Sequence, residues 1–281
     1  MSPHPITLVA FNELSMMLKQ PLVILITCLM FLFAALNGVA SADQLPRFYD
    51  YIEQGRDPLL AVGISNTFYV SSLLLAILSF SIAILSVAEE RSGGSIRVLI
   101  TKPLYRRDYI AGKYLGLSLF IVLLVAVVVL INASMIMVFY GGPISISELA
   151  LRLFFYTMVL SLYCIEMMGI AMLIGVFFKS LYQVLIISTT VLCFEKMFSV
   201  PVFLIKLQNT PLGDLLLFRP WLLLCKIISP GTGASSGAVL LDTVVPFSTW
   251  LSEALPYMVF LLALIVVLAL AICYIFNSEE A

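Results

Sequence analysis

The sequence predicts an all-α integral membrane protein with six transmembrane helices, and three observations lead to this fold class. Hydrophobic residues make up 62% of the 281 residues and charged residues only 11%, compared with about 25% charged residues in soluble domains. The mean hydropathy is +1.12. The apolar residues lie in long runs, and a helix needs about 20 of them to cross the hydrocarbon core of a bilayer. These runs exclude an ordinary soluble fold.

Six runs are candidates for transmembrane helices, and together they make residues 1–281 a single transmembrane domain. They cover residues 21–40, 65–88, 114–140, 149–178, 183–205 and 256–276. Pro21 suits the first turn of the first helix. The fifth run is the weakest, because Glu195 and Lys196 interrupt it.

A short N-terminal segment and three aromatic residues are predicted to lie at the membrane surface. In residues 6–19, several apolar side chains can share one helical face, which favours a short helix on the cytoplasmic surface; an extension of the first span is the alternative. Tyr140, Trp250 and Tyr257 lie near predicted interfaces and are expected to anchor there.

The distribution of lysine and arginine predicts the orientation of the spans. Segment 89–113 carries six basic residues, whereas segments 41–64 and 141–148 carry two and none. Cytoplasmic loops carry the excess of positive charge, so segment 89–113 is predicted to be cytoplasmic. With six spans, both termini are then cytoplasmic and residues 206–255 form a larger outer loop. We expect a multi-pass protein of the cell membrane.

Residues 89–116 have the features of a compact, charged elbow between the second and third spans. Two glutamates and an arginine end the second span at the water boundary, and the two glycines that follow permit a sharp reversal of the chain. Pro103 ends the short apolar stretch after that reversal. Such an elbow is well placed to dock into a cytosolic partner. A solvated loop whose charge only fixes the topology is the alternative.

The residues of this elbow also carry a family resemblance. The residues that match are Glu90, Ser92, Gly93, Leu99, Pro103, Arg106, Ile110, Gly112, Lys113 and Gly116. In this order, between a second and a third span, they resemble the type-2 permease family of ATP-binding cassette (ABC) transporters. Segment 11–21, FNELSMMLKQP, resembles the family's lead-in to the first span. The sequence departs from the family pattern in its long outer loop and in the charges at Glu166, Glu195 and Lys196.

The resemblance implies a permease subunit of an ATP-driven transporter, with export as the expected direction and no enzymatic activity on this chain. Two six-span subunits, either two copies or this chain and a paralogue, would pair in the lipid bilayer. Two cytosolic ATPase subunits would hold ATP and Mg²⁺, and the elbow would act as the coupling helix. The residues expected to couple it to the ATPase are Glu89, Glu90, Arg91, Ser92, Gly93, Gly94, Arg97, Leu99, Lys102, Pro103, Arg106, Arg107 and Lys113.

The chain itself carries no recognisable motif for nucleotide, metal or nucleic acid. A phosphate-binding P-loop requires GxxxxGK[ST], and GVFFKS at 175–180 lacks the glycine before its lysine. The single histidine and the five cysteines form no ligand pattern, and a net charge of −1 gives no basic field for nucleic acid. We therefore expect no catalytic residue, metal or cofactor on this chain. The energy must come from another chain or from an ion gradient.

Glu166, near the middle of the fourth predicted span, has two interpretations. An ionisable group at the centre of a membrane helix costs roughly 2.5–3.5 kcal/mol on insertion scales. It is either a cation or proton site, or a protonated, hydrogen-bonded group at a subunit interface, where Gly169 and Ala171 favour close helix packing. The first interpretation supports a second function, a stand-alone secondary transporter or channel with Glu166 as its ion-coupling group. Such folds often contain internal repeats, and we find none between residues 1–140 and 141–281.

Overall fold

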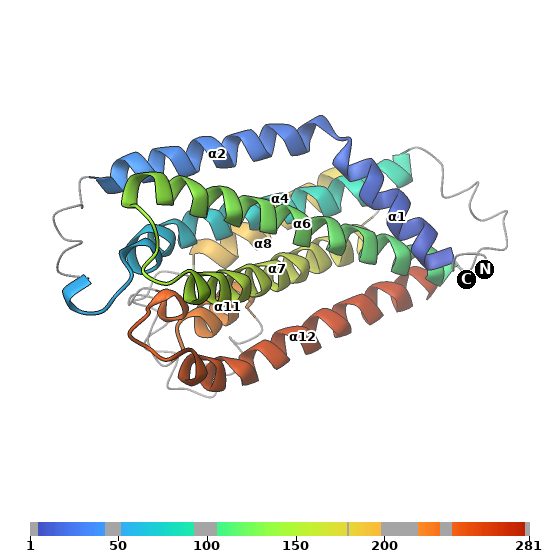
Figure 1. Cartoon of the computed structure of the whole chain (residues 1–281). Helices are drawn as coiled ribbons and strands as arrows, with labels where there is room; N and C mark the ends of the chain where they lie inside the picture. Colours follow the sequence, from blue (N-terminus) through green and yellow to red (C-terminus); the bar gives the residue numbers. More distant parts are fainter. Residues whose placement is uncertain are drawn as a thin grey trace.

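A computed structural model describes residues 5–42, 52–92, 106–178, 180–197, 219–230 and 238–278, and within them every regular element is helical. Figure 1 shows the long helices lying side by side in an elongated bundle. The helices are α1 (Pro5–Leu18), α2 (Pro21–Ala42), α4 (Ser65–Ser92), α6 (Arg106–Tyr140), α7 (Ile146–Phe177), α8 (Leu181–Met197), α11 (Pro220–Ile228) and α12 (Phe247–Ser278). A π-helical turn, η2 (Leu59–Ile64), and a 3-10 turn, η4 (Val239–Leu241), complete the described elements.

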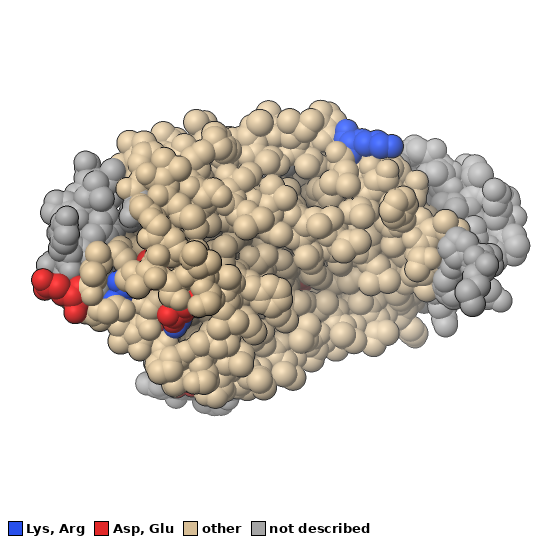
Figure 2. Space-filling model, viewed as in Figure 1, with Lys and Arg blue, Asp and Glu red and all other residues tan. Residues whose placement is uncertain are grey.

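Four of the described helices are long and apolar enough to cross a membrane, which makes the chain a multi-pass membrane protein. The apolar segments are Thr67–Ser86, Asp108–Phe139, Ile146–Phe177 and Phe247–Phe276. They coincide with the second, third, fourth and sixth predicted spans. Figure 2 shows a wide belt with almost no charged side chain across the viewed face, and the charged side chains lie near its ends.

The first and fifth predicted spans have weaker counterparts. Helices α1 and α2 qualify as one further span only as a pair, bent by 60° at a short break. The fifth prediction, 183–205, corresponds to α8, in which the apolar helical stretch Tyr182–Cys193 is shorter than a span. Residues 198–205 and the side chains of Glu195 and Lys196 lie outside the described part of the chain. Four or five spans are thus found, and the sixth stays a prediction.

Two helices begin earlier than the apolar runs indicated. Helix α6 begins at Arg106 rather than at residue 114, and Asp108 in its first turn suits the positive end of a helix dipole. Helix α12 begins at Phe247 rather than at residue 256, so Pro256 lies inside the helix. Proline is tolerated inside membrane helices, because neighbouring groups satisfy the freed carbonyl. Helical structure therefore extends beyond the hydrophobic runs at both places.

The described chain begins and ends at the same end of the bundle as the last turn of α4 and the first turn of α6, both of which belong to the elbow (Figure 1). We call this the elbow end. The opposite end, which carries η2, η4 and the first turns of α7 and α12, is called the loop end. The side of the membrane on which the elbow end and both termini lie stays a prediction.

Helix α6 runs the length of the bundle and contacts α1, α2, α7, α12 and η2. Its inward residues Leu117, Ile121, Val125 and Val128 are fully buried. Near the loop end, Gly63 of η2 lies so close to α6 that a Cβ atom there would approach the Ile136 side chain at 2.4 Å. This close contact helps to make α6 the central helix of the fold.

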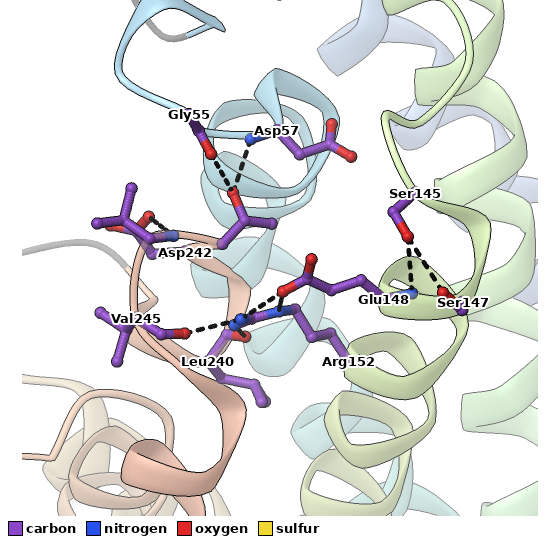
Figure 3. A network of polar contacts seen from close by, with 11 residues as sticks. Gly55, Asp57, Ser145, Ser147, Glu148, Arg152, Leu240, Asp242 and Val245 are labelled. Carbon is purple, nitrogen blue, oxygen red and sulfur yellow. Dashed lines mark hydrogen bonds and ion pairs between the residues drawn. The ribbon is translucent and has the colours of Figure 1, made fainter.

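A buried guanidinium closes the loop end, as Figure 3 shows. Arg152 of α7 is fully buried and donates hydrogen bonds to the carbonyl oxygens of Leu240 at 2.6 Å and Val245 at 2.8 Å. It also forms an ion pair with Glu148 Oε1 at 2.9 Å. Ser145 accepts a hydrogen bond from the Glu148 N–H and caps α7. Arg152 therefore fastens the segment before α12 to α7.

Asp57 extends this network to the segment before α4 (Figure 3). Its buried carboxylate accepts hydrogen bonds from the backbone N–H groups of Leu59 and Ile144 at 3.0 and 3.1 Å. Its own N–H donates to the hydroxyl of Thr243 at 2.8 Å. The loop end thus joins α7, the segment before α7, the segment before α12 and the segment before α4. Buried polar groups need hydrogen-bond partners, and these segments supply them to one another.

The predicted membrane-interface role of Trp250 is wrong. Its side chain is fully buried, and its indole N–H donates to the Ile227 carbonyl at 2.9 Å, which packs α11 against α12. Tyr257 is partly buried, and the Lys226 ammonium lies 5.6 Å from its ring centroid. A tryptophan near a helix end is thus used for internal packing here.

Arg152→Met is expected to lower the free energy of unfolding by about 3 kcal/mol, because it leaves two buried carbonyls and a carboxylate without their donor. Arg56→Ala is the matched control, since its ion pair with Asp242 at 3.4 Å is partly exposed and such pairs contribute about 0–1 kcal/mol. Thermal unfolding in detergent compares the two variants. Equal stabilities would contradict the clamp role of Arg152.

Candidate coupling site

The candidate coupling site begins where α1 lies against the first turns of α6. A Cβ atom added at Gly112 would lie 2.8 Å from the Ile6 carbonyl oxygen, and one at Gly116 would lie 2.5 Å from the Ala10 carbonyl oxygen. The spacing Gly-x-x-x-Gly places both glycines on one face of α6 and lets two helix backbones approach closely in a membrane. The contact therefore depends on the absence of side chains at these positions.

A buried ion pair lies between the same two helices. The Lys113 ammonium donates to Glu13 Oε1 at 3.2 Å, and the exposed fractions of the two side chains are 3% and 8%. Charges taken out of water are tolerated only when they are paired, and removal of one partner leaves an uncompensated buried charge. The pair thus fixes α1 to α6 in one register, beside the two glycine contacts.

The next residue, Tyr114, points to the other side of α6. Its hydroxyl lies 3.3 Å from the position that a Cβ atom at Gly169 of α7 would occupy, and Leu268 of α12 lies 3.4 Å from the same position. The Tyr114 hydroxyl has no hydrogen-bond partner within the described ranges. At the base of α6, Lys113 therefore contacts α1. Tyr114 contacts α7 at the point where α7 lies against α12.

Glu166 lies one helical turn from Gly169, with an exposed fraction of 2%. The structure buries it inside this single chain, where Tyr114 of α6 lies near enough for electrostatic interaction with Glu166 and with Cys273 of α12. Gly169 and Ala171 are both buried, and Gly169 packs against Tyr114 and Leu268 of the same chain instead of a second subunit. Glu166 therefore does not lie on a surface that a second subunit could contact.

The predicted coupling residues fall into three groups. Glu89, Glu90, Arg91 and Ser92 form the last turn of α4, and Arg106 and Arg107 open α6. Lys113 differs from expectation, because it faces Glu13 inside the molecule instead of presenting its charge to a partner. The remaining predicted residues lie outside the described part of the chain: Gly93, Gly94, Arg97, Leu99, Lys102 and Pro103.

Sequence reasoning missed Glu13 as a member of this site. The spacing of Gly112 and Gly116 gives a signal for close helix contact, but it does not identify the partner helix. The prediction of a short helix over residues 6–19 is confirmed by α1, which is bent by 60° from α2. Its outward side exposes Leu8 and Phe11 to 55% and 73%, and its place on the cytoplasmic membrane surface stays a prediction.

A comparison with protein-family models gives one match that covers nearly the whole chain. Residues 7–281 match the model described as ABC-2 family transporter protein. The chain belongs to the ABC-2 transporter family. It is accordingly a permease component of an ABC transporter, and members of this family typically partner with an ATP-binding cassette ATPase. Such permeases are transport subunits rather than enzymes and generally carry no cofactor of their own. No curated protein matches the chain significantly.

Gly116→Ala is expected to destabilise the contact between α1 and α6 by about 1–3 kcal/mol, because the added methyl group meets a backbone oxygen that cannot turn aside. Gly142→Ala is the control, since no atom lies within 4 Å of its Cβ position. Hydrogen exchange of the α1 amides in detergent should accelerate only in the Gly116 variant. Unchanged exchange would show that the close contact does not hold α1.

Proposed function

We propose that this chain couples ATP hydrolysis by a separate, cytosolic ATPase subunit to substrate export across the cell membrane. The observation that carries this proposal is the two-sided base of α6, with Lys113 paired to Glu13 of α1 and Tyr114 directed to α7 and α12. A force applied to the elbow acts directly on α6. Because α6 contacts α1, α7 and α12 there, the displacement reaches three other helices without a long relay.

The loop end supports a lever mechanism. Arg152 ties α7 to the segment before α12, and the Asp57 network ties in the segment before α4. Closure of the ATPase dimer on ATP would move the elbow end while the loop end stays clamped. The helices would then change their mutual angles, and a path along the bundle would open on one side of the membrane and close on the other.

The topology in this proposal follows the charge distribution. Segment 89–113 faces the cytoplasm because it carries six of the fifteen lysine and arginine residues, more than any other segment between the predicted spans. The termini lie on the same side, and a second copy or a paralogous six-span permease completes a pair above two ATPase subunits. Residues 89–107 of the elbow would form the surface that receives the ATPase, while Lys113 acts from inside.

The second candidate function is a stand-alone secondary transporter or channel that uses Glu166. Its burial at a crossing of membrane-spanning helices is the observation that favours it, because an ionisable group there is costly unless it has a use or a partner. The family match favours the first function. In that function, Glu166 is a protonated group that holds α7 in its place among the helices.

Co-purification separates the two functions. The chain should be isolated with a P-loop ATPase in a stable assembly of about two permease and two ATPase subunits, and transport in proteoliposomes should require ATP. Maleimide labelling of single cysteines at Arg106 and Arg107 should occur only from the cytoplasmic side. Gradient-driven flux by the purified chain alone, without any ATPase, would overturn the proposal and favour the second function.

A further inference from the structure

A cleft of about 540 Å³ lies between α4 and α8. Its volume falls within the range of about 300–1,000 Å³ that is typical of small-molecule sites. The α4 wall runs from Leu73 to Leu85, and the α8 wall from Leu185 to Cys193. The α4 wall belongs to the candidate span Thr67–Ser86, and the α8 wall belongs to the shorter apolar helical stretch Tyr182–Cys193, which packs against α4. A ligand would therefore enter this cleft from the bilayer rather than from water.

The shape of the cleft is that of a slot. The α4 wall extends over about 18 Å at the 1.5 Å rise of an α-helix, so the volume is distributed along a narrow path. The aromatic ring on this path belongs to Phe80, which is itself 1% exposed, and the accessible walls are aliphatic, with Ile77 and Leu185 exposed to 41% and 43%. Such walls suit an extended hydrocarbon chain better than a flat ring system, which needs aromatic faces to stack on.

The polar groups of the cleft are few and uncharged. Among the described residues that line it, Ser81 donates its hydroxyl to the Ile77 carbonyl and Thr189 donates to the Leu185 carbonyl, both at 2.8 Å. Ser188, 1% exposed at the floor of the cleft, has no hydrogen-bond partner within those ranges. A charged headgroup would find no counter-ion among the described lining residues. The lining therefore selects for a neutral, aliphatic portion of a ligand.

We propose that the cleft between α4 and α8 binds the aliphatic chain of an amphipathic molecule, and that molecules of this class are the transported substrate. The substrate assignment rests on the proposed function, whereas binding of the aliphatic chain in the cleft does not. The polar end of the molecule lies outside the slot. As the bundle changes its helix angles, the separation of α4 and α8 changes with them, and the aliphatic chain is released into the transport path.

The test uses a diazirine-bearing palmitic acid analogue and the permease–ATPase complex in nanodiscs of phosphatidylcholine and phosphatidylglycerol. After irradiation, mass spectrometry should find adducts on residues 185–193 that saturate with probe and are competed by excess palmitic acid. The outward face of α12 is the internal control, because Val259, Val266 and Leu270 are exposed to 55–65% and do not line the cleft. Labelling there should rise in proportion to the probe.

Two tryptophan variants sharpen the test. Ile77→Trp fills the slot and should lower the affinity of the saturable site about tenfold or more. If palmitic acid is a substrate, it should stimulate ATP hydrolysis by the permease–ATPase complex. Ile77→Trp should abolish this stimulation. Val266→Trp is the matched control, because Val266 is an exposed residue outside the cleft. It should change neither the affinity of the saturable site nor the stimulation of ATP hydrolysis.

Three outcomes would overturn the inference. Non-saturable labelling at residues 185–193, equal to that of α12, means bulk lipid only. Efficient disulfide formation between Cys193 of two copies, with no labelling of the cleft, means that a second copy covers it. Saturable labelling without any effect on ATP hydrolysis or transport overturns the substrate assignment. Failure of the chain to assemble with an ATPase counts against the proposed function instead, and the labelling can still be measured on the chain alone.

Discussion

The ion pair between Glu13 and Lys113 is the interaction on which the elbow end depends. Two opposite charges, both nearly inaccessible to solvent, lie 3.2 Å apart between a short N-terminal helix and the base of the central helix. Neither charge is tolerable in this environment without the other. The pair therefore does more to fix the place of α1 than to add net stability. Beside it, the two glycines of α6 allow the backbones to meet.

The two ends of the bundle are built from different interactions. At the loop end, Arg152 and Asp57 bind backbone groups from several segments, so that end is closed by a polar network that any relative motion would break. At the elbow end, the described residues meet at glycines and at the ion pair of Glu13 and Lys113, and apolar contacts such as that of Gly169 with Leu268 allow small shifts. A rigid end and an adjustable end are what a lever requires. This contrast supports the proposal that places the coupling function at the elbow.

The sequence predicts the class of fold and four of the spans, because hydrophobic runs of membrane length have few other interpretations. It also predicts the helix over residues 6–19 and the close packing at Gly169. It does not predict that Lys113 points inward, since its position among six basic residues suggests a charged surface. It does not find the Arg152 clamp either, because the carbonyl groups that this arginine binds belong to a segment distant in sequence. The predicted interface role of Trp250 is wrong for a similar reason, because the hydrogen-bond partner of its indole is a backbone carbonyl of α11. Interactions with distant backbone atoms leave no pattern in the chain itself.

Exchange of the two charges of the buried pair tests the central claim most directly. Glu13→Lys and Lys113→Glu are made singly and together, and transport per ATP hydrolysed is measured in proteoliposomes with the partner ATPase. Each single variant should insert in the membrane but lose most of its coupling, because α1 no longer moves with α6, and the double variant should recover a large part of it. Normal transport per ATP in both single variants, or no recovery in a properly folded double variant, would contradict the account.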